Sequence, residues 1–299
     1  MSFALNVLAL SLPFMDLRRG LSTEPYSLQA SVRFLWESKL YVLAGVVVAF
    51  SMVFPFLKLA VMTLVLFGGV RETREQRTLE LVERYGKWSM LDVFLVCIML
   101  ALANDQFWID AAPRMGLICF TLAIVTSMLT SRHMLVRLGR GERGPVVELS
   151  HPRWLALGQA LLLSLLVAVL LVPFLEISDW LLKDRPISIL STIGGLWQSG
   201  ARSLAVIAVL FLVTAPLVSG LATLALFLRA AKDRDIDFAR RLVQQTRDWA
   251  MLDVFALALG IFLVEGNDFV RTELTWGAFL LALLLALYWP ASNWYGRRA

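Results

Sequence analysis

The chain has 299 residues, of which 59% are hydrophobic and 17% are charged, and its mean hydropathy is +0.72. Soluble globular domains carry about a quarter charged residues, so this composition excludes an ordinary soluble domain and predicts an integral membrane protein of the helical type. The net charge of +5 does not indicate a nucleic-acid-binding surface, because the basic residues lie in short segments between apolar runs.

Apolar runs of membrane-spanning length recur along the whole chain. A transmembrane helix needs about 20 apolar residues, and fewer where aromatic or polar ends complete it. The first run is short, so either this span is abbreviated or its true start lies upstream; no basic segment precedes it, as a cleaved signal peptide would require. We predict eight spans, at residues 1–14, 40–67, 90–103, 115–129, 154–174, 204–228, 251–264 and 276–289.

The distribution of Lys and Arg predicts the orientation of these spans. Eighteen basic residues lie in one alternating set of segments, and nine lie in the other. Because cytoplasmic loops carry the excess of Lys and Arg, we expect a multi-pass inner-membrane protein with both termini in the cytoplasm. The richer set comprises residues 68–88, 130–153, 229–248 and the C-terminal tail, and the poorer set comprises residues 15–39, 104–114, 175–203 and 265–275.

A sequence repeat divides the chain into two halves. The heptapeptide WSMLDVF at 88–94 returns as WAMLDVF at 249–255, an offset of 161 residues, and Pro55 pairs with Pro216 at the same offset. An even number of spans separates equivalent points, which predicts parallel repeats. The predicted domains are a four-span repeat at 1–137, a cytoplasmic linker at 138–152 and a second four-span repeat at 153–299.

The segments between the spans differ in composition between the two sides of the membrane. Residues 27–34 and 187–195, in the predicted external loops, could each form a short strand or a re-entrant helix, and the hydrophobic period does not decide between them. Residues 71–87 and 229–248 are helix formers with charges throughout. We interpret both as cytoplasmic helices that lie against the membrane surface.

The repeated motif places an aspartate at the start of a span in each half. Asp92 follows Trp88, an interface-belt tryptophan, by four residues and therefore lies about 6 Å inside the cytoplasmic boundary. It is either a helix-terminal cap, with Ser89 completing a capping box, or a functional ionisable group at membrane depth. The second copy keeps Asp253 after Trp249 but lacks the capping serine, which weakens the cap interpretation.

Lys58 is the candidate partner of Asp92. It lies inside the predicted span 40–67, about 13 Å from its cytoplasmic end, where an unpaired ammonium costs a few kcal/mol. Pro55, one turn earlier, frees a backbone carbonyl that a lysine can use. The alternatives are a snorkelling lysine without function and a buried Lys58–Asp92 pair that handles protons. Ser219 stands at the equivalent position in the second half, so Asp253 has no matching cation.

Further polar residues extend this candidate network. Ser51 lies on the helix face of Lys58, and Thr214 and Ser219 line a comparable stretch in the second half. Such residues are either members of a polar network or ordinary hydrogen-bonding groups between helices. Cys97 and Cys119 lie in apolar runs without a C-x-x-C spacing, and the common catalytic motifs are missing, so no metal, cofactor or enzyme activity is predicted.

Taken together, these residues resemble the paraquat-inducible protein A family. The resemblance rests on tandem four-span repeats, Pro-x-x-Lys at 55–58 and W-x-M-L-D-V-F opening the third span, and it covers the chain from Leu12 to about Trp289. It implies an inner-membrane protein that works with a periplasmic tunnel protein of mammalian-cell-entry (MCE) domains and moves phospholipid between membranes. It also implies small β-structures in the external loops. Members carry cysteine zinc ribbons ahead of each repeat, and this sequence has none.

Three functions compete at this point. The first is an MCE-type lipid transport subunit, with proton movement at Lys58 and Asp92 as its gate. The second is a membrane scaffold that anchors an envelope complex without transporting anything, in which case the aspartates are helix caps. The third is a small-molecule secondary transporter, for which the spans offer few central polar groups.

Overall fold

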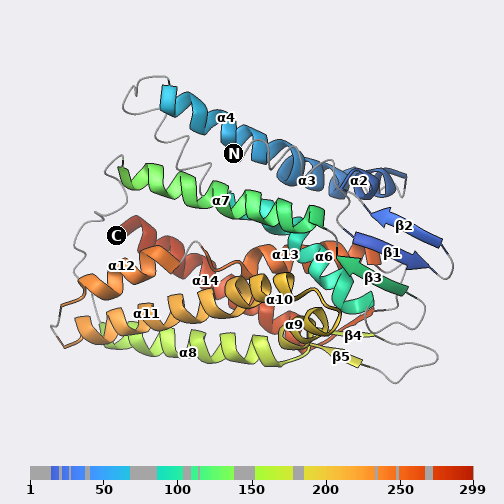
Figure 1. Ribbon diagram of the computed structural model, residues 1–299. Coiled ribbons are helices and arrows are strands. Elements are labelled where there is room, and N and C mark those ends of the chain that lie inside the picture. Colours follow the sequence, from blue (N-terminus) through green and yellow to red (C-terminus); the bar gives the residue numbers. More distant parts are fainter. Residues whose placement is uncertain are drawn as a thin grey trace. The chain divides into compact units, whose positions relative to one another are not determined.

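A computed structural model of the chain describes residues 15–19, 22–26, 28–37, 41–67, 86–103, 109–113, 115–137, 152–177, 185–232, 235–246, 249–266 and 272–298 (Figure 1). The chain divides into two compact units. The first comprises Met1–Gly141, Gly194–Ala205 and Leu257–Phe262, and the second comprises Glu142–Ile193, Val206–Ala256 and Leu263–Ala299. Each unit contains apolar helices and one three-stranded antiparallel sheet.

The described part of the first half starts with two strands and continues as apolar helices. Its central helix runs without a break through three elements, α3, η1 and α4, because a π-helical turn joins two α-helices. The elements are β1 (Met15–Arg19), β2 (Ser22–Tyr26), α2 (Leu28–Glu37), α3 (Tyr41–Val47), η1 (Val48–Val53), α4 (Phe54–Phe67), η2 (Lys87–Met90), α6 (Leu91–Ala103), β3 (Ile109–Pro113) and α7 (Met115–Arg137).

The strands, the central helix with its π-turn, and the two helices that follow occur in the same order in the second half, among the described residues. Its central helix again passes through a π-helical turn, here η3 between α10 and α11. The elements are α8 (Pro152–Leu171), β4 (Leu175–Ile177), β5 (Arg185–Ile187), α9 (Ile189–Gln198), α10 (Arg202–Ala208), η3 (Val209–Thr214), α11 (Ala215–Ala230), α12 (Asp237–Thr246), α13 (Leu252–Gly266), β6 (Thr272–Leu274) and α14 (Trp276–Arg298).

The two sheets share one topology. Their strand orders are β2-β1-β3 and β5-β4-β6, with every pairing antiparallel. Met15 pairs with both Tyr26 and Pro113, and Leu175 pairs with both Ile187 and Leu274, which are the same positions within one residue of the 161-residue offset. The predicted, mainly helical fold is confirmed, and strands lie in both large loops, as the resemblance implied.

The helices coincide with the predicted spans. Within the described residues, Pro152–Leu171 and Arg202–Ala230 are each long and apolar enough to cross a membrane. Only 28% of the apolar window of Pro152–Leu171 is buried, which is too little for the core helix of a soluble protein. Large side chains such as Trp154 (74% exposed) and Trp276 (80% exposed) present apolar surface outward, as expected for a protein surrounded by lipid. The predicted span 1–14 lies outside the described residues.

Segments that the sequence left undecided are helical. Residues 28–34 lie in α2 and residues 189–195 lie in α9, so the helix alternative holds for most of both segments, whereas Ile187 ends strand β5. The segment 229–248 contains α12, as predicted, and α12 packs against α11 within the second unit. The matching segment 71–87 lies almost wholly outside the described residues.

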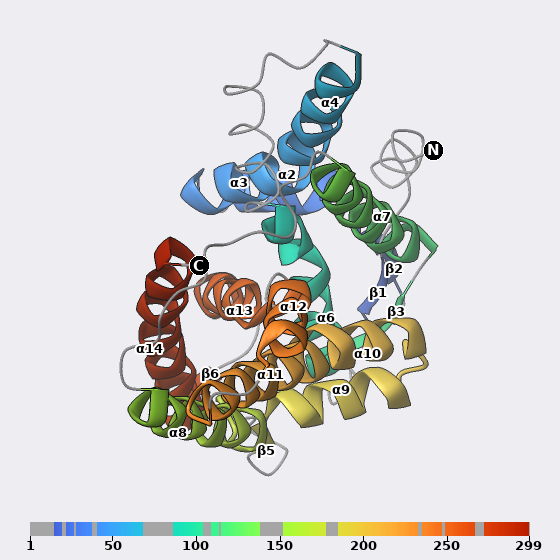
Figure 2. The same ribbon diagram turned by 90° about the vertical axis from the view of Figure 1, so that its left-hand side faces the viewer.

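The second unit is built around α11. Helix α11 packs against α8 and α12, and α14 also packs against α8 (Figure 2). Gly220 permits the close approach of α8, because a Cβ at this position would lie 2.7 Å from the Leu163 Cδ2 atom. The buried side-chain amide of Gln159 donates to the carbonyl of Gly220 at 3.3 Å, which satisfies a polar group inside this apolar contact.

Candidate functional site

Each half carries a π-helical turn immediately before its proline. Turn η1 ends two residues before Pro55, and η3 ends two residues before Pro216. The widened bonding continues at each turn's end, where Phe54 N–H donates to the carbonyl of Ala49 and Ala215 N–H donates to that of Leu210, five residues back. Proline removes one backbone donor, so a nearby carbonyl is left without its α-helical partner. These turns therefore expose backbone polar groups inside apolar helices, where an outside donor can use them.

In the second half, that donor comes from the repeated heptapeptide. The Met251 N–H donates to the carbonyl of Phe211 in η3 at 3.4 Å. The ring of Trp249 stacks on the Phe211 ring with centroids 5.6 Å apart and an interplanar angle of 13°. The motif thus binds the π-turn through both backbone and aromatic contacts, and the stacked ring gives the tryptophan of the motif a packing role.

The other end of the heptapeptide holds the corner of the sheet. Phe255 makes an edge-to-face contact with Phe174 at 5.7 Å, and both rings are fully buried. The carbonyl of Pro173 accepts the Thr275 hydroxyl and the Gly277 N–H, the latter at 3.0 Å. The Pro-Phe pair and the heptapeptide, far apart in sequence, therefore form one packed corner within the second unit.

Asp253 lies in the first turn of α13 and is half-buried. Its Oδ1 accepts the N–H of Val254 at 3.0 Å. A carboxylate at this place offsets the positive end of the helix and its unpaired N–H groups. The placement favours the cap interpretation for the second copy of the motif.

Lys58 is buried in α4, one turn after the buried Pro55, with only 3% of its surface exposed. Its ammonium reaches Gly86, the residue before η2: a Cβ on Gly86 would lie 3.0 Å from Lys58 Nζ. Because Trp88 lies in η2 and Asp92 lies in α6 directly after it, the lysine contacts the start of the segment that carries the motif.

Not every predicted residue of the first half can be placed with its side chain. Ser51 lies in η1, Ser89 in η2 and Asp92 in α6, but their side chains lie outside the described part of the structure. The Lys58–Asp92 pair accordingly stays a prediction. Turn η1, which carries Ser51, packs against η2 with Ser89 and against α6 with Asp92 within the first unit.

The predicted polar stretch of the second half does not form one cluster. Thr214, the last residue of η3, is exposed, whereas Ser219 in α11 is buried. Pro216, between them, is buried. The carbonyl of Ser219 accepts the Thr223 hydroxyl at 2.8 Å, a local bond within the helix. At the position equivalent to Lys58, the second half thus holds a neutral side chain in an apolar helix contact.

Three contributors were missed from the sequence. Gly86 leaves space for the Lys58 ammonium, Gln159 places a buried amide against Gly220, and Phe211 offers both a ring and a carbonyl to the motif. The signal for Gly86 was its place directly before Lys87-Trp88, and Gln159 is the one polar residue in an otherwise apolar stretch of its span. Within the described residues, no group of three His, Cys, Asp or Glu side chains could hold a metal ion.

Comparison with known proteins places these features in a family. The family described as Paraquat-inducible protein A matches residues 1–138 and 152–299. The "Intermembrane transport protein PqiA" of Escherichia coli strain K12 is 29% identical over 115 residues, which are 37% of this chain and 28% of that protein, and proteins of the same name from Escherichia coli O6:H1 and Shigella flexneri match equally. The match thus spans under a third of these relatives' length. No solved structure matches the chain.

Proposed function

The chain belongs to the paraquat-inducible protein A family, and from this premise we propose that it is an inner-membrane subunit of an MCE-type lipid transport system. In this proposal it passes phospholipid between the inner membrane and a periplasmic tunnel protein built from MCE domains. The name of the matched relatives, which describes intermembrane transport, supports the class of function. The apolar, outward-facing surface of helices such as α8 supports residence in the membrane.

The proposed topology has eight spans in two parallel four-span repeats, with both termini in the cytoplasm. Matching strand order, matching register and π-turns at the same offset support an internal duplication. The sheets then lie on the periplasmic side, at the ends of the spans where a tunnel protein would dock.

The observation that carries a transport role rather than a purely structural one is the burial of Lys58. A lysine 3% exposed in an apolar helix is costly unless its charge is compensated or used. Its ammonium lies against the segment that leads to Asp92. We propose that Lys58 and Asp92 exchange a proton during each cycle, so that the proton gradient drives the movement of lipid.

The first test is purification of the tagged protein from its native membrane, followed by mass spectrometry of co-purifying proteins and lipids. Enrichment of an MCE-domain protein together with phospholipid is the expected result. Recovery of the intact protein with neither partner nor lipid above the level of an unrelated membrane protein would refute the transport role.

A scaffold that anchors an envelope complex is the second candidate. The placement of Asp253 at a helix terminus, where it accepts a backbone N–H, favours a structural role for at least that aspartate. The two candidate functions predict different results when Asp92, the aspartate of the first half, is replaced. Asp92→Ser retains a capping side chain, so a scaffold tolerates it, whereas a proton-coupled transporter loses lipid movement.

A further inference from the structure

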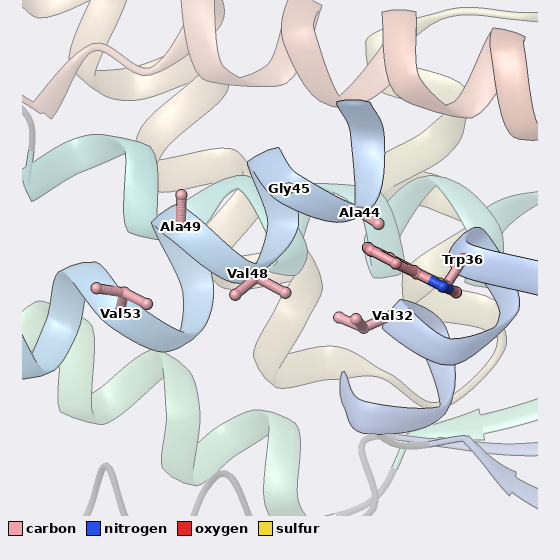
Figure 3. Close-up of a pocket in the computed structure, with 7 residues that line it drawn as sticks. All are labelled: Val32, Trp36, Ala44, Gly45, Val48, Ala49 and Val53. Atoms are coloured by element: carbon pink, nitrogen blue, oxygen red, sulfur yellow. The ribbon is translucent and has the colours of Figure 1, made fainter. Parts of the chain in front are cut away.

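An open apolar groove lies on the first unit between α2 and the helix formed by α3 and η1. It has a volume of about 350 Å³ and is lined by Val32, Trp36, Ala44, Gly45, Val48, Ala49 and Val53 (Figure 3). Two residues come from α2 and five come from the long helix. The indole nitrogen of Trp36 is the only polar atom among these side chains, so the groove offers nothing to recognise a charged or peptide-like ligand.

Small residues create the groove. Gly45 and Ala49 are four residues apart and therefore share one face of the helix. A Cβ built on Gly45 meets no other atom within 4 Å, so the space beside it is open. At the equivalent positions of the second half, the chain carries Val206 and Leu210, both larger. The small residues therefore give the first half this hollow, and side chains as large as those of the second half would fill it.

The groove is bordered by aromatic residues of the kind found at a membrane surface. Trp36 is 60% exposed, and its ring contacts that of Tyr41 edge-to-face at 5.0 Å. Exposed Trp and Tyr side chains anchor helices at the level of the lipid headgroups. At its other end the groove reaches Val53, and the exposed apolar surface continues along the same helix to Leu57. In the proposed topology, the hollow therefore runs from the headgroup level at Trp36 toward the hydrocarbon region.

We propose that this groove holds one acyl chain of a membrane phospholipid, with the headgroup at the level of Trp36. The volume corresponds to roughly twelve groups of the size of a water molecule, at about 30 Å³ each. A methylene group is of similar size, so most of a typical acyl chain fits. The inference rests on the proposed function, and it gives the transported lipid a binding place on the first half of the protein.

The groove would retain the acyl chain through close packing and not through the hydrophobic effect. Inside a bilayer the surrounding lipid tails are as apolar as the groove, so only closer van der Waals contact favours the bound chain. We therefore expect an enrichment of a few-fold over bulk lipid. The donor of Trp36 adds a hydrogen bond available only to a lipid whose polar end reaches the interface.

The test is photolabelling of the full-length protein in bilayer nanodiscs. The probe is phosphatidylethanolamine with a diazirine halfway along one acyl chain, diluted into phosphatidylethanolamine and phosphatidylglycerol. Peptide mapping then compares residues 32–53 with residues 193–214 of the same molecules. Labelling of 32–53 at least threefold above 193–214 is expected, and in Gly45→Val/Ala49→Leu it should fall to the level of 193–214.

Matched variants keep the outcome decisive. Leu57→Val changes a neighbouring exposed residue outside the groove and should leave the labelling of 32–53 unchanged. Should the double variant not fold, as judged by its melting temperature, Ala49→Leu alone carries the test. Equal labelling of the two segments would show that only ordinary boundary lipid was labelled, and so would a loss of labelling in Leu57→Val equal to that in the double variant. Either result would refute acyl-chain binding in the groove and would leave the proposed transport function intact. Failure of the proposed function would instead appear in the purification, as the absence of partner and lipid.

Discussion

The two π-helical turns share a backbone device and differ in charge. In both halves the turn directly precedes a buried proline, and in both it packs close to the segment that carries the W-x-M-L-D-V-F motif. Three residues after that proline, however, the first half has a buried Lys58 and the second a buried Ser219. The shared device is therefore sufficient to dock the motif and does not need the lysine. The lysine is what distinguishes the first half as a candidate site of charge movement.

The corner between the sheet and α14 is the place where the second half tolerates least change. A Cβ on Gly277 would lie 2.2 Å from the carbonyl oxygen of Pro173, a backbone atom that cannot rotate away. We expect Gly277→Ala to lower the free energy of unfolding by about 4 kcal/mol, the range of severe overpacking and broken backbone contacts. Chemical denaturation in detergent micelles measures it, and failure to accumulate in the membrane is the extreme form of the same result.

Two other glycines make this prediction a comparison. Gly260→Ala introduces a Cβ that meets nothing within 4 Å, so it should be neutral or stabilise by up to about 1 kcal/mol through helix propensity. Gly116 occupies the first-half position equivalent to Gly277 and is buried. A loss in Gly116→Ala similar to that in Gly277→Ala would show that both corners are built alike, and tolerance would show that they are not.

Loss of the Lys58 ammonium should be the largest functional effect. Lys58→Met keeps an unbranched apolar stem and removes the charge, so we expect the protein to insert and fold while phospholipid transfer falls about 100-fold, equivalent to about 2.7 kcal/mol. Ser219→Ala, at the equivalent position, should remain within twofold of the wild type. The measurement is transfer to the partner recovered in the purification. Wild-type transfer by Lys58→Met would remove proton coupling at this site.

Much of the fold follows from the sequence because a bilayer restricts it strongly. Apolar runs in a bilayer must be helices, so both ends of α6 and α8 were predicted to within a few residues. For α7 the predicted start is right, and the helix continues beyond the predicted end. The repeat at offset 161 gave the equivalence of the two halves. Residues 27–34 and 187–195 could not be assigned, because short amphipathic segments fit a strand and a helix equally well until tertiary contacts select one.

The site was less predictable, because it depends on contacts between distant segments. A π-turn has no sequence signature beyond the proline that follows it, so the exposed carbonyl of Phe211 could not be inferred. Gly86 became meaningful only once the side chain of Lys58 was seen to approach it. Thr214 and Ser219 were predicted to line one polar stretch, and the different exposure of the two residues shows that spacing alone does not place side chains in one environment.

The aromatic contact of the motif offers a moderate effect that compares the two copies directly. Trp249→Leu removes the ring stacked on Phe211 and leaves a smaller side chain at a half-buried position, so we expect a loss of about 2 kcal/mol in unfolding free energy. Trp88→Leu should cost a similar amount if the first copy docks on its π-turn in the same way. Melting temperatures of the two variants, measured in parallel, decide this. A tolerated Trp88→Leu would indicate that the first copy is held by other contacts.

The smallest effect, and the most specific, is expected at Gly86. A Cβ there would lie 3.0 Å from Lys58 Nζ, so the ammonium must move by a few tenths of an ångström. The flexible stem permits this, and alanine is the better helix former by about 1 kcal/mol, so stability should be unchanged or slightly raised in Gly86→Ala. Transfer should nevertheless fall about threefold if the position of the ammonium matters. Gly220→Ala is the matched control, because its Cβ displaces the apolar side chain of Leu163 and no charged group.

The comparison of these two glycine variants tests whether the exact position of the Lys58 ammonium matters for transfer, in addition to its presence. If Lys58 has only a structural role, Gly86→Ala should behave like Gly220→Ala, and phospholipid transfer should change in each variant only as much as the amount of folded protein does. A lysine that exchanges protons depends on distance, because proton transfer requires donor and acceptor within hydrogen-bond reach. Reduced transfer at undiminished stability in Gly86→Ala, together with unchanged transfer per folded molecule in Gly220→Ala, would therefore assign the functional charge to the first half of the molecule.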